Sequence, residues 1–272
     1  MPEIAEVETV RRVLKNKILN KKIVDVKIMY PKMIETNIDD FKKNIINNSF
    51  TDILRKGKWL IFELNDYYLL SHLRMEGKYF IKDINKEIIK HEHVIFYFDD
   101  NTTLRYHDVR KFGKMFLVKK NEINNVKELA KQGLEPNDIR LTSSYLLDKF
   151  KNKSLPIKST LLDQSIISGL GNIYADEVLF DAKINPLKQA KKITKEEANN
   201  IINSAKEIID NAIKCGGTTI RSYTSSLGVK GNYQDFLKVH KRENELCEIC
   251  KSKIIRIKIN GRSTYYCPKC QK

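Results

Sequence analysis

Two spacings of hydrophobic residues divide the chain. In residues 4–18 an apolar side chain recurs at every third or fourth position, which predicts an amphipathic helix. From residue 23 to about residue 119 the pattern changes to short β-branched and aromatic runs separated by Asn, Asp and Gly. Such runs predict a mainly antiparallel β domain. The clearest of them are residues 59–64, 67–70, 94–98 and 115–118.

The second half of the chain has a helical pattern. Residues 120–140 are polar and irregular, which predicts a linker between domains. The helices expected beyond it are residues 142–151, 156–163, 174–181 and 195–214. Cys215-Gly216-Gly217 follows the last of these, and glycine is typical of a helix end.

Four cysteines near the carboxyl end form two pairs, Cys247 with Cys250 and Cys267 with Cys270. Two residues separate the members of each pair and sixteen separate the pairs, which matches the ligand spacing of a tetrahedral zinc site. Between the pairs, an alternating run, an Asn-Gly turn and a second run predict a β-hairpin. We therefore predict a hairpin stapled by one structural Zn²⁺.

The charge of this module changes the picture. Residues 238–272 contain ten Lys or Arg and three Asp or Glu, a formal charge of +7, from which zinc with four thiolates subtracts two. The whole chain carries +16. A purely structural tail remains an alternative, but clustered basic charge favours contact with nucleic acid.

Length and cysteine use bound the protein class. The 272 residues suggest two domains, and no apolar run reaches the eighteen residues of a membrane span. The acidic start is unlike a secretory leader. Cysteines in metal spacing fit a reducing compartment, so a cytoplasmic protein is expected, with Cys215 as a buried small side chain.

The first residues suggest a nucleophile. If Met1 is removed, Pro2 becomes the amino terminus, and an α-amino group has a pKa of about 7.7–8.0 against about 10.4 for lysine. More of it is neutral, so it can attack a sugar carbon while Glu3 and Glu6 transfer protons. Proline and glutamate are equally ordinary at a helix start, and these residues alone favour that structural explanation.

Three further segments combine residues suited to DNA contact. In residues 105–113, Arg110 and Phe112 could fill the hole left by an unstacked base, although Phe112 would also suit a core. Residues 168–174 contain glycines that open a helix, suited either to binding a phosphate or to a tight turn. Residues 222–233 are rich in small side chains, as in an active-site lid or an idle loop.

Taken in order, these segments resemble the bacterial formamidopyrimidine-DNA glycosylase family (Fpg/MutM) over essentially the whole chain. The family opens Pro-Glu-x-x-Glu-Val-Glu-Thr, as at residues 2–9, and carries Gly-x-Gly-Asn-Ile-Tyr-Ala in a helix-two-turn-helix motif, as at residues 169–175. It ends in a four-cysteine zinc finger. The resemblance implies a bifunctional glycosylase and lyase of base excision repair, which removes 8-oxoguanine and formamidopyrimidines from duplex DNA.

The resemblance also implies roles for single residues. Pro2 would attack the anomeric carbon and form a Schiff base, followed by β- and δ-elimination. Glu3 matches the general acid and base, Glu6 a second acid near the sugar, and Lys58 a lysine that contacts the phosphate and assists proton transfer. The implied DNA contacts are the inserted residues Met75, Arg110 and Phe112, the phosphate contacts Asn172 and Arg262, and the weaker backbone candidates His72 and His91. The implied lesion pocket comprises Glu76, Arg221 and Tyr233.

The inserted residues favour oxidised purines, because the related endonuclease VIII-type enzymes, which prefer oxidised pyrimidines, generally lack them. Arg110 would face the orphaned cytosine. Two departures leave the fine lesion preference open: Arg221 stands where some members have lysine, and residues 133–136 replace the common Gly-Pro-Glu-Pro with Gly-Leu-Glu-Pro.

We therefore expect an α+β protein. Its parts would be an N-terminal antiparallel β-sandwich with flanking helices (2–120), a linker (121–140), a helix-two-turn-helix domain with a lesion-capping loop (141–236) and a zinc finger (237–272). A monomer would bind duplex DNA with an oxidised purine or abasic site in the bacterial cytoplasm. Two alternatives stay open: a pyrimidine-lesion glycosylase on the same scaffold, and a zinc-dependent DNA-binding protein that has lost catalysis.

Overall fold

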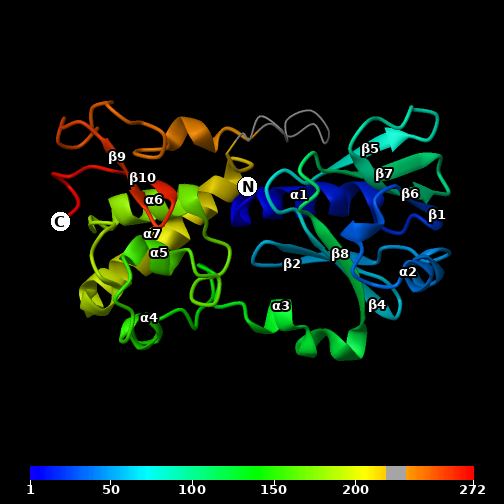
Figure 1. Cartoon of the computed structure of the whole chain (residues 1–272), viewed down its shortest axis with the longest axis horizontal. Coiled ribbons are helices and arrows are strands. Elements are labelled where there is room, and N and C mark those ends of the chain that lie inside the picture. The colour runs from blue at the N-terminus through cyan, green and yellow to red at the C-terminus, as the bar shows by residue number, and fades with distance from the viewer. Residues whose placement is uncertain (219–230) are drawn as a thin grey trace. The chain divides into compact units, whose positions relative to one another are not determined.

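The computed structural model describes residues 1–218 and 231–272, which form two compact units (Figure 1). Unit 1 comprises Met1–Ala130 and the described residues of Gly216–Gly231. Unit 2 comprises Lys131–Cys215 and Asn232–Lys272. None of the helices in the described part of the chain combines the length and hydropathy required to cross a bilayer.

Unit 1 opens with helix α1 (Ile4–Ile18), which has the predicted bounds. Glu3 and Glu6 form a capping box at its start, and so satisfy backbone N–H groups that a first helical turn leaves without partners. The predicted apolar stripe is buried in the core of the unit, with Val7, Leu14 and Ile18 fully covered.

Two four-stranded antiparallel sheets follow. One has the order β2 (Asp52–Lys56), β3 (Trp59–Glu63), β4 (Tyr67–His72) and β8 (Lys114–Lys119). The other has the order β1 (Ile23–Ile28), β6 (Glu92–Phe98), β7 (Thr102–His107) and β5 (Lys78–Asp83). Their facing side chains share one core, in which the Phe50 ring lies 5.1 Å from Phe62 of β3 and 5.9 Å from Phe96 of β6. The β-sandwich is as predicted.

Short helices were missed in this half of the chain. Helix α2 (Ile38–Ile45) is capped by Asn37 and buries Phe41 and Ile45. The segment predicted as an irregular linker forms η2 (Lys120–Asn125) and α3 (Lys127–Ala130). Its Val126 and Leu129 pack with Trp59, Ile61 and Leu70, which come from the outer face of the β2-β3-β4-β8 sheet. The apolar outer face of a sheet must be covered by another element. In this mostly polar segment, Val126 and Leu129 are enough to cover it.

Unit 2 is mainly helical. Its α-helices are α4 (Ser143–Phe150), α5 (Ile157–Leu161), α6 (Asn172–Asp181) and α7 (Lys195–Lys214). One short 3₁₀ helix, η3 (Ala190–Lys192), lies between α6 and α7, and another, η4 (Tyr233–Phe236), precedes the hairpin; η1 (Pro31–Met33) lies in unit 1. Helix α6 begins two residues earlier than predicted, because Gly171 is its N-cap. Strands β9 (Ile255–Ile259) and β10 (Arg262–Tyr266) pair as predicted, across a turn in which Asn260 and Gly261 both have positive φ. The α+β class is confirmed.

Candidate active site and nucleic-acid interface

The amino terminus of unit 1 lies among charged side chains. Pro2 is buried, and Glu3 and Glu6 are 2% and 4% exposed. Burial lowers the pKa of the Met1 amino group, whereas Glu3 and Glu6 oppose this shift, Lys58 reinforces it and Glu76 opposes it. An amine at this place is therefore surrounded by the proton-transferring groups that the sequence suggested.

Glu6 also organises the backbone around it. Its Oε2 accepts a hydrogen bond from the Glu3 amide at 2.8 Å, and its Oε1 accepts from the Thr218 amide at 2.8 Å and from the Thr218 hydroxyl at 3.0 Å. A Cβ on Gly217, where φ is +77°, would lie 2.8 Å from Oε1. Glu6 thus joins the start of α1 to a segment more than two hundred residues further along the chain.

Lys58 lies at the turn between β2 and β3 and is 5% exposed. An arginine network that the sequence analysis did not identify holds this hairpin on α1. Arg55 donates from Nε to Glu8 at 3.0 Å and from Nη1 to the Gly57 carbonyl at 3.0 Å, and Arg11 and Arg12 bind the same Glu8 carboxylate. Burial alone would raise the pKa of Glu8, but the three arginines hold it at about 2.

Two loops of unit 1 carry the residues predicted to enter the duplex. Met75 belongs to residues 73–77, between β4 and β5, and Arg110 and Phe112 belong to residues 108–113, between β7 and β8. Phe112 is 51% exposed, so it is not a core residue as the alternative supposed. The Arg110 guanidinium carbon lies 4.7 Å from the centre of the Phe112 ring. The two side chains therefore form one exposed cation–π pair.

The two histidines proposed as backbone contacts differ in chemistry. Burial, aided by Arg74, Lys58 and Lys114, lowers the pKa of His72 to about 3. Its Nδ1 accepts the Arg74 amide at 3.0 Å, so the ring is neutral and Nε2 carries the proton. His91 has a positive φ of 74° and lies in a group of rings, 6.2 Å from His93 and 5.8 Å from His107.

In unit 2, Asn172 and the hairpin that bears Arg262 are bound to each other. The Asn172 Nδ2 donates to the Ser263 carbonyl at 2.9 Å, and Arg262, the preceding residue, is exposed. The sequence analysis did not identify the group beneath them. Lys158, which is fully buried, donates to the Ser263 carbonyl and the Thr264 hydroxyl, both at 2.9 Å, and pairs with Asp176 at 2.7 Å.

Asp176 extends this buried group, because its second oxygen lies 2.7 Å from Nδ1 of His240. The neighbouring Glu177 accepts backbone N–H groups from residues 238, 239 and 240. Ion pairs and hydrogen bonds thus attach the zinc hairpin and the segment before it to α5 and α6, and place Asn172 and Arg262 on one small surface.

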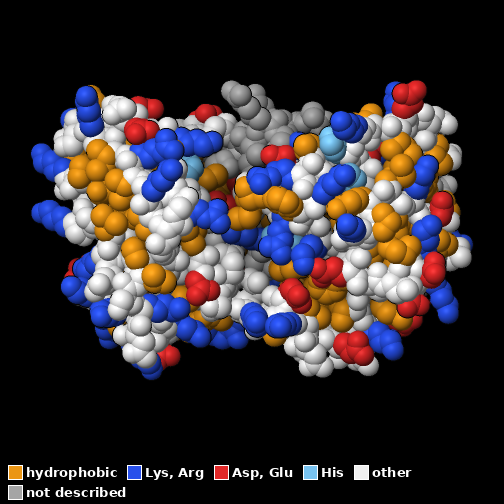
Figure 2. All heavy atoms as spheres, viewed as in Figure 1, with side chains coloured by type: hydrophobic (Ala, Val, Ile, Leu, Met, Phe, Trp, Pro, Cys, Tyr) orange, Lys and Arg blue, Asp and Glu red, His pale blue; other side chains and the backbone are white. Residues whose placement is uncertain are grey.

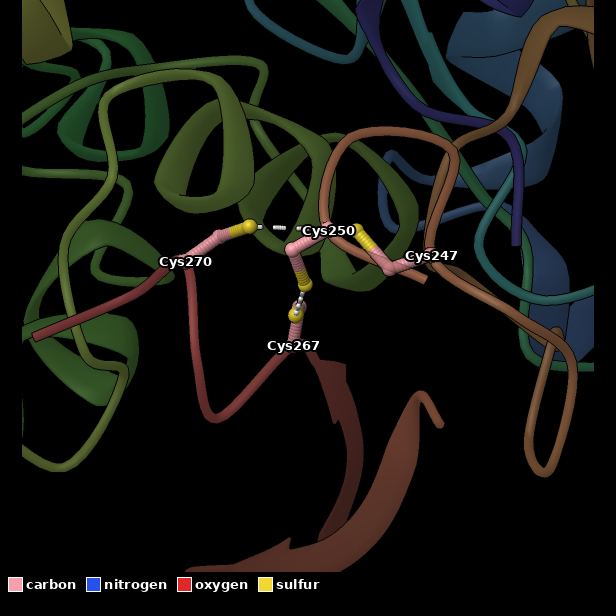
Figure 3. Close-up of side chains that lie close together, drawn as sticks. All are labelled: Cys247, Cys250, Cys267 and Cys270. Atoms are coloured by element: carbon pink, nitrogen blue, oxygen red, sulfur yellow. Dashed lines mark hydrogen bonds between the residues drawn. The ribbon is translucent and has the colours of Figure 1, made fainter. Parts of the chain in front are cut away.

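The four cysteines converge in unit 2 (Figure 3). Their Sγ atoms all lie within 4.8 Å of one another, with 3.8 Å between Cys247 and Cys270 and 3.4 Å between Cys250 and Cys267. A tetrahedral site with Zn–S bonds of about 2.3 Å needs sulfur–sulfur distances of about 3.8 Å. Four thiolates at this spacing fit one structural Zn²⁺, as predicted from the sequence.

Of the three residues proposed for the lesion pocket, the structure describes Glu76 and Tyr233. Arg221 and residues 222–230 lie outside the described residues. Glu76 lies in unit 1, where its charge raises the pKa of the Met1 amino group and so opposes the effect of burial. Tyr233 is buried in unit 2, 6.0 Å from the rings of both Tyr174 and Phe236, and lines a cavity of about 510 Å³. Burial and nearby carboxylates raise the pKa of Tyr233, so its hydroxyl stays protonated.

Basic side chains outnumber acidic ones on the visible face of the protein (Figure 2). Figure 2 shows Lys and Arg side chains spread over the visible face of both units, with fewer acidic ones between them. With 50 Lys and Arg against 34 Asp and Glu, the surface suits a polyanion.

Comparison with known proteins agrees with this assembly of sites. Three family models match consecutive parts of the chain: the formamidopyrimidine-DNA glycosylase N-terminal domain over residues 1–115, the formamidopyrimidine-DNA glycosylase H2TH domain over residues 132–224, and the zinc finger found in FPG and IleRS over residues 244–272. The formamidopyrimidine-DNA glycosylase of Listeria innocua is 44% identical over 277 residues, with 100% of both chains covered. That of Ligilactobacillus salivarius is 45% identical over 272 residues, with 100% of this chain and 99% of the relative covered.

Solved structures agree as well. A complex between Lactococcus lactis Fpg and DNA containing an abasic site has a TM-score of 0.95 at 39% identity, with 99% of each chain covered. A structure of MutM with DNA containing carbocyclic 8-oxo-G has a TM-score of 0.94 at 39% identity, with 100% of each chain covered. With matches of this extent to models, sequences and structures, the chain belongs to the formamidopyrimidine-DNA glycosylase family.

Proposed function

We propose that this protein is a bifunctional DNA glycosylase and AP lyase that removes 8-oxoguanine and formamidopyrimidines from duplex DNA. The observation that carries the proposal is the amino terminus of unit 1, where buried Pro2 follows the Met1 amine and the charges of Glu3, Glu6 and Lys58 act on that amine. Family membership sets the reaction class, since the family's relatives are formamidopyrimidine-DNA glycosylases. Structures of relatives contain abasic, Fapy-dG or 8-oxo-G DNA, which sets the substrate class.

In the proposed reaction, Met1 is removed and the Pro2 nitrogen attacks C1′ of the extruded nucleotide. The C1′–N bond to the base breaks and its electron pair leaves with the base, which takes up a proton. The Pro2 nitrogen loses its proton, and its lone pair forms the C1′=N bond of the Schiff base while the C1′–O4′ bond breaks. The electron pair of that bond stays on O4′, which takes up a proton. Removal of a C2′ proton then expels the 3′ phosphate by β-elimination, and δ-elimination expels the 5′ phosphate.

The charge of each group at the amino terminus determines its proposed role in the reaction. Burial lowers the pKa of the Met1 amino group. Pro2, the next residue, is buried as well, and burial favours the neutral, nucleophilic form of an amine. Lys58 contacts the phosphate and assists proton transfer. Glu3 is the general acid and base. Glu6 acts near the sugar and, through its bonds to Thr218, keeps the start of α1 in place.

The remaining proposed contacts bind and deform the DNA. Met75, Arg110 and Phe112 enter the duplex, with Arg110 facing the orphaned cytosine. Asn172 and Arg262 bind phosphates, and the zinc ion keeps the hairpin that bears Arg262 folded against Asn172. His91 and the neutral His72 contact the backbone, His72 as a hydrogen-bond donor through Nε2. Glu76, Arg221 and Tyr233 form the lesion pocket. We also propose four parts of the chain: the catalytic domain (2–120), the linker (121–140), the helix-two-turn-helix domain (141–236) and the zinc finger (237–272).

The preference for purines is also proposed. One relative from Lactococcus lactis was crystallised with DNA that contains an oxidized pyrimidine, so the scaffold alone does not decide the lesion. Excision of 8-oxoguanine opposite cytosine should exceed excision of thymine glycol or 5-hydroxyuracil in matched duplexes. A faster reaction with either pyrimidine would replace this proposal by the pyrimidine-lesion alternative.

The experiment that tests the function is borohydride trapping on duplex DNA with 8-oxoguanine opposite cytosine, with peptide mapping by mass spectrometry. A reduced adduct on Pro2 is expected, which would establish the nucleophile and the loss of Met1 together. The same duplex with guanine is the control and should give none. Tight binding of the lesion duplex without any adduct would favour a DNA-binding protein that has lost catalysis. We also propose that the enzyme acts as a monomer in the bacterial cytoplasm, where the nucleoid lies.

A further inference from the structure

The two loops of unit 1 that carry Met75, Arg110 and Phe112 meet at one buried side chain, Tyr106 of β7. A Cβ built on Gly77, in the first loop, would lie 2.0 Å from the Tyr106 Oη, and a Cβ built on Gly113, in the second, would lie 1.8 Å from it. Both positions therefore need glycine so that the tyrosine hydroxyl can lie between the loops. Tyr106 itself is 0% exposed and rests on Tyr79 at 5.1 Å.

The second loop has an anchor of its own. The Asp108 carboxylate, which is 0% exposed, accepts three backbone N–H groups: Arg110 at 3.0 Å, Phe112 at 2.9 Å and Gly113 at 2.8 Å. The Asp108 backbone is bonded in turn to His91, by its amide at 3.0 Å, and to His93, by its carbonyl at 2.8 Å. A buried carboxylate thus determines the path of a loop whose tip is exposed.

The tip is therefore ordered before any partner arrives. Arg110 and Phe112 extend into solvent as a pair 4.7 Å apart, while the backbone N–H groups of both residues bind Asp108. A wedge that enters a duplex must stay rigid, because each rotatable group that is ordered on binding costs free energy. Three N–H bonds to one buried carboxylate fix the backbone of this loop in advance, so the backbone adds little to that cost on binding.

We propose that Tyr106 and Asp108 are positioning residues that hold Met75, Arg110 and Phe112 in the arrangement that fills the space left by an extruded nucleotide. Asp108 sets the path of the second loop, and Tyr106 sets the separation of the two loops. This inference rests on the proposed function, because it takes these three residues as those that enter the duplex.

A binding experiment tests the inference without catalysis. The probe is a duplex with a tetrahydrofuran abasic analogue opposite pyrrolo-cytosine, a fluorescent base that reports contact with the orphaned position. The variants are Asp108→Asn, which keeps the volume but replaces an acceptor oxygen by NH₂, and Tyr106→Phe, which removes one oxygen. Val109→Ala is the matched control, since Val109 lies in the same loop and is 49% exposed.

The wild type and Val109→Ala should change the pyrrolo-cytosine signal equally at saturation. Asp108→Asn should lose most of that change and bind about tenfold more weakly, and Tyr106→Phe about threefold more weakly. Wild-type signals from both variants at saturation would overturn the inference, as would a wild type that produces no signal change. Melting temperatures identify a misfolded variant, and because Tyr106→Phe alters one atom it keeps the test decisive if Asp108→Asn does not fold.

Activity gives a second readout that separates positioning from a general loss of structure. With 8-oxoguanine opposite cytosine, Asp108→Asn should lower kcat/KM about tenfold, whereas with 8-oxoguanine opposite an abasic analogue the loss should be only about threefold, because Arg110 then has no base to hold and only Phe112 is misplaced. Equal losses on the two duplexes would assign Asp108 to stability alone. A wild type that gives the fluorescence change but cleaves neither duplex would refute the proposed catalysis and leave the positioning role supported.

Discussion

The zinc hairpin of unit 2 and the amino-terminal site of unit 1 both hold charged groups in fixed places. The hairpin does so with residues that are close in sequence, and the amino-terminal site with residues that are far apart. The hairpin's four ligands lie between residues 247 and 270, with two short pairs around one turn. The amino-terminal site joins Glu6 to Thr218 and Glu8 to Arg55, across 212 and 47 positions. A local site is visible as spacing in the sequence, whereas a site assembled by the fold is visible only as isolated residues.

The two sites also differ in what stabilises them. The hairpin is short, and its cluster of Phe180, Val239, Cys247, Ile254 and Cys267 is small, so the metal must supply much of its folding free energy. The amino-terminal site stands on the sandwich core, where both sheets contribute buried side chains. Loss of one partner should therefore unfold the first and only loosen the second.

The largest effect is expected from Cys250→Ser. Structural zinc contributes about 10–16 kcal/mol to the folding of such modules, so losing one thiolate should release the ion and unfold the hairpin. Zinc content and near-ultraviolet circular dichroism measure this. Cys215→Ser is the matched control, since Cys215 lies outside the cluster, and it should retain one zinc per chain. Full zinc retention by Cys250→Ser would contradict the four-thiolate site.

Lys158→Met should come next. Its ammonium is fully buried against Asp176, and removing one partner of a buried pair costs about 3–5 kcal/mol because the other charge stays behind. Urea unfolding measures the difference. Lys153→Met, which breaks an exposed pair with Asp163 at 3.5 Å, is the control and should change stability by less than about 1 kcal/mol. Equal effects would show that the polar group beneath the hairpin is dispensable.

Glu8→Gln tests the scaffold of the amino-terminal site and should cost about 2–3 kcal/mol, because three arginines lose a common carboxylate. The pKa of Glu8 in the folded protein, about 2, lies well below the 4.5 of an unperturbed glutamate. Its contribution is therefore complete above pH 4.5 and is lost as the pH falls through about 2. Unfolding curves between these limits should converge for wild type and variant, whereas Glu122→Gln should match the wild type throughout. A constant difference would contradict the role of the Glu8 charge.

Arg262→Ala should have the smallest effect. Loss of one phosphate contact should weaken binding to any duplex and reduce the slope of log K against log salt by about one. Titrations at several salt concentrations measure this, with Lys43→Ala on α2 as the control. An unchanged slope would remove Arg262 from the interface and leave the hairpin as a staple.

The sequence was informative in proportion to how local each feature is. The bounds of α1 and α7 and the register of the hairpin were predicted, because periodicity, capping residues and an Asn-Gly turn act over a few positions. Helix α3 was missed, because its reason to form is the apolar outer face of a sheet built from distant strands. The resemblance to the family supplied Lys58, which no local signal had singled out, and it favoured DNA contact over a core position for Arg110 and Phe112.

The sequence by itself determined the metal chemistry, the fold class and the family, since each rests on residue types at short and regular spacing. Only the tertiary structure decided which side chains hold the functional ones. Asp108 and Tyr106 beneath the loops of Met75 and Arg110, Glu8 beneath the Lys58 hairpin and Lys158 beneath Arg262 act through contacts made by folding. The physical reason is that a buried carboxylate or ammonium takes its role from the partners that desolvate with it, and those partners come from other parts of the chain.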